Sequence, residues 1–132
     1  MEQTLKKIND FHGHIGPYAV LGYKMGLIAN KKLGEDPFCK KALVYTDIKP
    51  PHSCIIDGIQ LSSNCTLGKG NIKIKKKADI KVEFSNKKKE KITTILKPSI
   101  KKEIDTEVTE ENILEYSEKY FKMKNSDLFE II

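Results

Sequence analysis

The sequence of 132 residues is 39% hydrophobic and 32% charged, with a formal net charge of +6; this indicates a single domain, residues 1–132, able to bury a core without disulfides or a structural metal. All 24 basic residues are lysines. Because arginine makes the bidentate contacts to guanine and phosphate, its absence argues against specific recognition of nucleic acid.

The first part of the sequence predicts two helices. A short amphipathic helix covers residues 2–10, and Pro17, which suits a first helical turn, begins a second helix that runs to about Lys32 and ends at Gly34. Small residues recur along one face of the second helix, at Ala19, Gly22, Gly26 and Ala29. Since glycine costs a helix about 1 kcal/mol relative to alanine, this face indicates the close approach of another backbone.

The middle of the sequence predicts a strand, a helix and three further strands. A largely buried strand covers residues 41–48 and ends before the prolines at 50–51, and Ser53 is a suitable N-cap for a helix over 54–64. Lysines alternate with apolar residues in the strands expected at 71–77, 78–85 and 91–97.

The last part predicts one more helix, which starts near Thr109. Its inward-facing residues are expected to be Ile113, Tyr116, Tyr120 and Phe121. The order α-α-β-α-β-β-β-α indicates the α+β class, with a mixed or antiparallel sheet of about four to five strands and helices packed on one face.

His12 and His14 lie two residues apart in a glycine-containing turn. Residues at this spacing share one side of an extended backbone, and neutral imidazole is the commonest metal ligand in proteins. We therefore expect a metal-binding or catalytic role for at least one of them. The alternative is a structural role beside the next helix.

Cys54 and Asp57 are the candidates for catalysis. In the first turn of its helix Cys54 would lie near unpaired backbone N–H groups and the positive end of the helix dipole, which favour the thiolate. The isoleucines of this helix occupy the opposite arc, so Cys54, Asp57 and Gly58 are expected to face away from the core. The alternative is that Cys54 is a small buried apolar residue, although burial of an unpaired Asp57 carboxylate would be costly.

Cys65 lies eleven residues after Cys54, roughly 15 Å if the segment is all helix, so the two are not expected to share one metal. The following Gly-Lys-Gly turn could hold an anion through backbone N–H groups and Lys69, while a plain β-turn is the favoured explanation of the glycines alone. His52 could reach the Cys54 site, and Cys39 is expected to be incidental. The lysine-rich strands predict a solvated sheet face, with an acidic partner as the alternative.

The three cysteines and the absence of an apolar signal segment predict a reducing, cytoplasmic environment. The longest apolar run, residues 15–29, is too short to span a bilayer and contains Lys24. We expect no membrane-spanning segment.

The two motif regions together resemble the FmdE family, named after a protein associated with molybdenum formylmethanofuran dehydrogenase. The resemblance rests on Phe-His-Gly-His-x-x-Pro at 11–17, a Gly-Tyr-Lys-Met-Gly helix at 22–26, Cys-x-x-Asp-Gly-Ile-Gln at 54–60 and Cys-Thr-x-Gly-Lys-Gly-Asn at 65–71. It covers roughly residues 8–97. It implies an α+β core that tends to form a homodimer, and a link to methanogenesis or related one-carbon metabolism.

The resemblance also implies a set of site residues. Position by position these are His12, His14 and Cys54 for a metal, Cys54 and Asp57 for catalysis, and Cys65 and Lys69 for a ligand. A set of His, Cys and carboxylate side chains suits Zn²⁺ or another divalent transition metal.

Two departures from the family pattern are present. Gly16 stands where the family commonly has a cysteine, with Tyr18 at the following glycine, which puts dithiol chemistry in doubt. No cysteine follows Cys65, so the C-terminal zinc finger of many family members is absent.

Three functions are compatible with these features. The first is an FmdE-like protein that assists formylmethanofuran dehydrogenase, with the dehydrogenase subunits as partners; without a four-cysteine ferredoxin pattern, no pterin or iron–sulfur cluster is expected in this chain. The second is a stand-alone thiol enzyme that uses Cys54. The third is a non-catalytic interaction module that uses the lysine-rich sheet.

Overall fold

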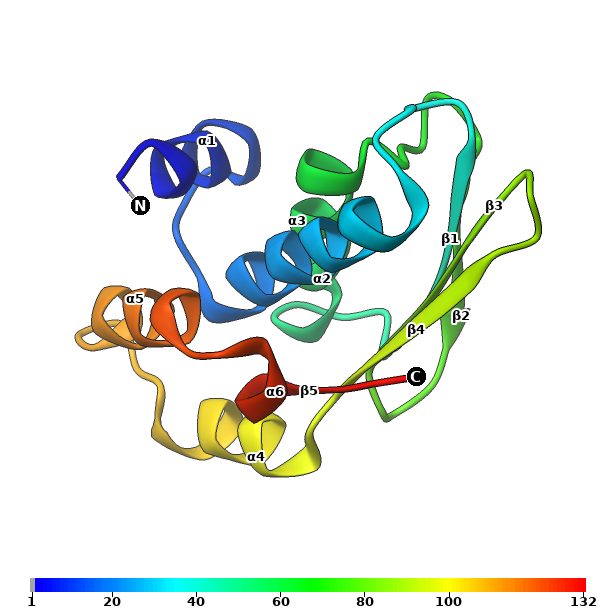
Figure 1. Cartoon of the computed structure of the whole chain (residues 1–132). Coiled ribbons are helices and arrows are strands. Elements are labelled where there is room, and N and C mark those ends of the chain that lie inside the picture. Colours follow the sequence, from blue (N-terminus) through cyan, green and yellow to red (C-terminus); the bar gives the residue numbers. More distant parts are fainter. Residues whose placement is uncertain (1) are drawn as a thin grey trace.

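The computed structural model describes residues 2–132 as an α+β domain, in which the helices lie on one side of a five-stranded sheet (Figure 1). The sheet has the order β2-β1-β3-β4-β5; β1 and β2 are parallel, and all other neighbours are antiparallel. This confirms the predicted fold class. The helical elements are α1 (Glu2–His12), α2 (Pro17–Leu33), the 3₁₀ turn η1 (His52–Cys54), α3 (Ile55–Ser63), α4 (Pro98–Glu107), α5 (Ile113–Lys122) and α6 (Asn125–Leu128). The strands are β1 (Lys40–Thr46), β2 (Ile72–Lys76), β3 (Lys81–Asn86), β4 (Lys91–Leu96) and β5 (Phe129–Ile131).

Alternation along the strands gives the sheet one buried face and one open face. The side chains of Val44, Val82 and Phe84 are at most 1% exposed and belong to the main core. The residues between them, such as Leu43 and Glu83, are only half-buried. A period of two is expected of a sheet that is covered by helices on one side.

Helices α2 and α3 lie in direct backbone contact. A Cβ on Gly22 would overlap the carbonyl group of Ile55, and a Cβ on Gly58 would overlap the carbonyl group of Ala19. This confirms the close approach predicted from the small residues of α2. Because α3 occupies this face, it gives no support to a homodimer. The expectation that Gly58 faces away from the core is wrong, because Gly58 is where α3 touches α2.

The C-terminal part contains three elements that the sequence analysis missed, namely α4, α6 and β5. Pro98 was interpreted only as the end of a strand, but it also occupies the first turn of α4, a favoured place for proline. Ile100 and Ile104 are the buried side of this helix. Helix α5 begins at Ile113 and not near Thr109.

Lys24 is a buried lysine that joins α2 to α5. Its side chain donates hydrogen bonds to the carbonyl oxygens of Tyr120, Phe121 and Met123, at 2.9, 3.0 and 2.5 Å. Carbonyls at the end of a helix lack partners within the helix, so one ammonium group satisfies three of them here. Burial lowers the pKa of Lys24.

The predicted boundaries near the site need one correction. Helix α3 begins at Ile55, and Cys54 occupies its N-cap without a side-chain capping bond, because His52–Cys54 form η1. Ser53 is therefore not the N-cap. Within residues 2–132 no helix is both long enough and apolar enough to cross a membrane; the cytoplasmic location stays a prediction.

Candidate functional site

His12 and Asp57 form the centre of the candidate site. His12 is the last residue of α1, and Asp57 lies in the first turn of α3. The His12 Nδ1 and Asp57 Oδ2 atoms are 2.5 Å apart, and the two side chains are 10% and 37% exposed. The second ring nitrogen, His12 Nε2, is buried and has no hydrogen-bond partner among residues 2–132. A buried polar atom without a partner is costly, so a ligand at this nitrogen would be stabilising.

His14 lies between His12 and Gly16. The chain turns at Gly13, whose φ of 94° favours glycine, and the rings of His12 and His14 have their centroids 4.8 Å apart. A Cβ on Gly16 would lie 3.1 Å from His14 Cε1. The backbone of Gly16 is extended, with φ −136°, a conformation open to any residue. The position of the family's usual cysteine therefore adjoins the His14 ring.

Cys54 lies at the N-cap of α3, half-buried against the main core. Burial raises the pKa of its thiol, and the negative charge of Asp57 raises it further. The expectation that the helix N-terminus would favour the thiolate is therefore wrong. The thiol is desolvated, and its charged neighbour has the same sign as the thiolate.

The side chains of this region have the donor types of a metal site but do not form a complete one. Residues 2–132 contain no group of three or more His, Cys, Asp or Glu side chains placed to hold a metal ion. His12 nevertheless has the arrangement typical of metal ligands, in which one ring nitrogen bonds a carboxylate and the other is left for the metal. The donor types fit a divalent transition metal, with His12 as the best-prepared ligand.

Cys65 and Lys69 lie at the other end of α3, away from the turn that holds Cys54. Cys65 is fully buried, and burial raises the pKa of its thiol despite the nearby lysines. Lys69 Nζ donates to Thr66 Oγ1 at 2.9 Å. The backbone N–H of Gly70 donates to carbonyls within the same turn. The structure does not bring these residues to the His12 site, and their predicted role in ligand binding stays untested.

A second polar cluster, centred on His52, was largely missed by the sequence analysis. His52 Nε2 lies 2.9 Å from Asp105 Oδ2, and its Nδ1 lies 3.3 Å from Asp47 Oδ2. The Tyr18 hydroxyl donates to Asp105 Oδ1 at 2.7 Å. A groove of about 670 Å³ beside this cluster is lined by Tyr18, His52 and Asp105 among others. The cluster ties α4 to the start of α2 and to η1, and so fixes the segment that carries Cys54.

Acid is expected to weaken the bond between α4 and η1. Burial acts to raise the pKa of Asp105, but hydrogen bonds from Tyr18 and His52 and the charges of His52 and Lys101 bring it below its usual 3.8. A carboxylate with a lowered pKa stabilises the fold above its unfolded-state pKa, and this stabilisation is lost as the pH falls through the folded-state value. Asp105→Asn is therefore expected to lower the free energy of unfolding by about 1 kcal/mol at pH 7 and to make it less sensitive to pH below about 4.

Urea unfolding of both proteins between pH 2.5 and 7 measures this difference. Asp79→Asn is the control, because Asp79 has no ion pair within the described residues. Equal pH dependence of Asp105→Asn and the unmodified protein would contradict the expectation.

Comparison with known proteins now decides the family. The sequence matches the family described as FmdE, Molybdenum formylmethanofuran dehydrogenase operon, over residues 11–130. The chain belongs to the FmdE family. The FmdE fold accordingly returns in a solved structure, that of a tungsten formylmethanofuran dehydrogenase FmdE-like protein from Syntrophus aciditrophicus. The TM-score is 0.70 at 22% identity, over 99% of this chain and 70% of the other.

A further relative of this FmdE chain is a probable S-adenosyl-L-methionine-binding protein from Archaeoglobus fulgidus. The two are 35% identical over 74 residues, which are 54% of this chain and 20% of the relative. The matched segment thus spans about a fifth of that protein.

Proposed function

We propose that this FmdE-family protein holds a divalent transition metal at His12 and serves formylmethanofuran dehydrogenase-type one-carbon metabolism as an accessory protein. The observation that carries the metal proposal is the buried, unpartnered Nε2 of His12, whose other nitrogen is bonded to Asp57. His14, 4.8 Å away between ring centroids, is the second candidate ligand.

The Asp57 carboxylate supports the metal proposal in two ways. It fixes the His12 ring so that Nδ1 carries the hydrogen and Nε2 has a free lone pair. It also places a negative charge beside the cation without being needed as a direct ligand. A bound divalent ion would act as a Lewis acid or hold a ligand in place, and zinc suits imidazole and thiol donors.

Cys54 contributes a thiol to the edge of the same site. Because burial and Asp57 raise the pKa of this thiol, the protein without metal disfavours the thiolate that a stand-alone thiol enzyme would need. We therefore place the thiol enzyme second to the metal-binding accessory protein. Rapid alkylation of Cys54 at neutral pH by iodoacetamide would reverse this order.

Replacing His12 by alanine is expected to weaken the binding of Co²⁺ or Zn²⁺ at least tenfold, because His12 supplies the best-prepared nitrogen. Asp57→Asn is expected to weaken it by about tenfold as well, since partners that orient a metal-bound histidine are typically worth 10- to 100-fold. Calorimetric titration of the metal-free protein measures both effects.

His52→Ala is the matched control for this titration, because His52 is bonded to two carboxylates in the second cluster. Equal losses in His12→Ala and His52→Ala would contradict the proposal, as would tight metal binding that neither variant alters. S-adenosyl-L-methionine, named for the Archaeoglobus relative, belongs in the same titrations as a candidate ligand of the site.

Association with the dehydrogenase is tested separately. The proposal expects the tagged protein to recover formylmethanofuran dehydrogenase subunits from native cells, identified by mass spectrometry. Recovery without metal binding would leave the partner and remove the metal; metal binding without recovery would do the reverse.

A further inference from the structure

The open face of the sheet is basic, because lysines from four strands project from it. The register places Lys41, Ser85 and Lys91 in one row across β1, β3 and β4, and Lys73, Leu43, Glu83 and Thr93 in the next row across β2, β1, β3 and β4. Residues in such rows are direct side-chain neighbours. No helix covers this face (Figure 1).

A hollow of about 380 Å³ lies on this face. Lys41, Lys73 and Lys91 belong to its lining, together with Leu43, Ser85 and Thr93, and the turn residues Gly70 and Asn71 close one end. Gly70 has open space where a Cβ would be. The Gly-Lys-Gly-Asn motif thus ends at this hollow, although its own N–H groups and Lys69 are engaged elsewhere.

The positive charges around the hollow lack partners. Lys41, Lys73 and Lys91 form no ion pair within residues 2–132, whereas Glu83, the acidic residue of the lining, is 3.6 Å from Lys81. The hydroxyl groups of Ser85 and Thr93 likewise have no hydrogen bond to the described part of the protein. Like charges that surround a concave surface concentrate the field there.

We propose that this hollow binds a small organic anion with two or more carboxylate or phosphate groups. Lys41 and Lys91 stand two strands apart, or about 10 Å along the sheet, so one ligand with separated anionic groups can meet both. The half-buried Leu43 offers an apolar contact in the middle, and the hydroxyls of Ser85 and Thr93 can donate to oxyanions. This site is separate from His12 and does not depend on the metal proposal.

The same face is poorly suited to single-stranded nucleic acid. Binding of that kind uses exposed aromatic rings on which bases stack. The aromatic ring of this face, Tyr45, is already covered, with Lys81 Nζ at 4.7 Å and Lys77 Nζ at 5.7 Å from its centroid. The hollow itself has the volume of a small-molecule site.

The test is an NMR titration of the ¹⁵N-labelled full chain with citrate and with pyrophosphate at constant ionic strength. The proposal expects saturable shifts centred on the amides of β1, β3 and β4 around the hollow. The double variant Lys73→Gln/Lys91→Gln is expected to weaken binding at least fivefold.

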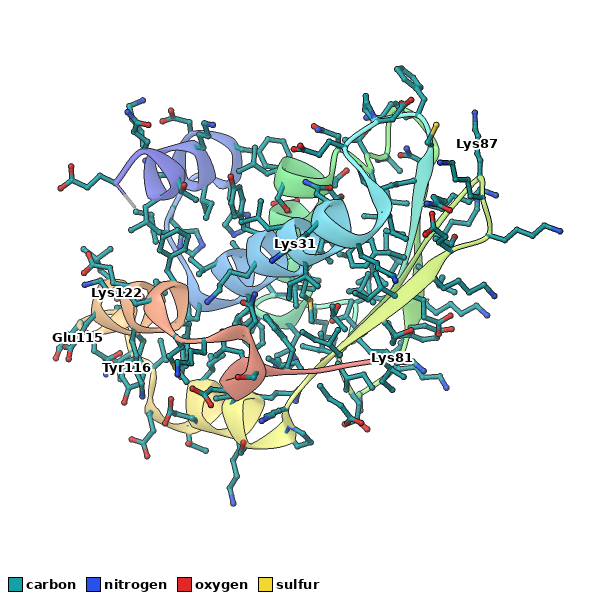
Figure 2. The ribbon with its side chains drawn as sticks, in the orientation of Figure 1. Lys31, Lys81, Lys87, Glu115, Tyr116 and Lys122 are labelled. Atoms are coloured by element: carbon teal, nitrogen blue, oxygen red, sulfur yellow. The ribbon has the colours of Figure 1, made fainter. Side chains whose placement is uncertain are left out.

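The matched control is Lys31→Gln/Lys122→Gln, which removes the same charge from α2 and α5, on the helical side of the molecule (Figure 2). Equal weakening by both double variants, or shifts that do not saturate, would overturn the proposal by showing non-specific screening. Hexaglutamate that binds more tightly than citrate and pyrophosphate through the same lysines would also overturn it, in favour of an acidic protein partner.

Discussion

Replacing Gly58 by alanine is expected to lower the free energy of unfolding by about 3 kcal/mol. The new Cβ would overlap the carbonyl of Ala19 and would lie 2.6 Å from the backbone nitrogen of Tyr23. Both are atoms of the α2 backbone, which cannot move aside as a flexible side chain does, so α2 and α3 must separate. Overpacking of a core usually costs 1–3 kcal/mol, and the better helix propensity of alanine recovers only about 1 kcal/mol. Urea unfolding followed by circular dichroism measures the change.

The separation of α2 and α3 should also reach the candidate site. Asp57 precedes Gly58 on α3, so a shift of α3 is expected to lengthen the 2.5 Å contact between His12 and Asp57. Gly68→Ala is the control, because nothing lies within 4 Å of its Cβ position; its stability should change by less than about 0.5 kcal/mol. A Gly58→Ala protein as stable as Gly68→Ala would show that the two helices are not in the contact described.

Replacing Gly16 by cysteine is expected to raise the affinity for Co²⁺ or Zn²⁺ by about 100-fold, or about 2.7 kcal/mol. The extended backbone of Gly16 accepts a side chain, and its Cβ position lies 3.1 Å from His14 Cε1 and 3.7 Å from His14 Nδ1. His14 is exposed and can shift by a few tenths of an ångström. A thiolate beside two imidazoles would supply the third protein ligand that the site lacks, and zinc sites use three or four.

Cobalt titration measures this gain and identifies the ligand, because thiolate coordination gives a charge-transfer absorption that imidazole does not. Gly16→Ser is the matched control, with nearly the same shape and no thiol. An equal gain in both variants would assign the effect to chain stiffening, and no gain in either would show that position 16 does not face the metal.

The fold was predictable where local patterns carry it. Pro17 and Gly34 marked the ends of α2 correctly, and the glycines of α2 predicted a close backbone neighbour. Helix α4 was missed because Pro98 ends one element and begins another. Strand β5 was missed because three residues give no period, and its pairing with β4 (Leu96 opposite Phe129) spans more of the chain than any local signal.

The candidate site was predictable in its residue types and less so in its arrangement. His12 and Asp57 were both identified, but Asp57 was paired in expectation with Cys54, whereas it lies against His12 across 45 positions of sequence. The pKa of Cys54 was mistaken because the helix dipole was weighed without burial and the Asp57 charge. The partner of His52, Asp105, could not be foreseen because it lies on α4, which was itself missed.

Anomalous X-ray diffraction at the zinc edge, on crystals of the unmodified protein grown with Zn²⁺, tests the central claim most directly. The account predicts an anomalous peak about 2.1 Å from His12 Nε2, with Asp57 still bonded to Nδ1 and no peak at this place in His12→Ala crystals. Zinc bound elsewhere with His12 Nε2 left free, or no peak from a protein saturated with zinc in solution, would contradict it.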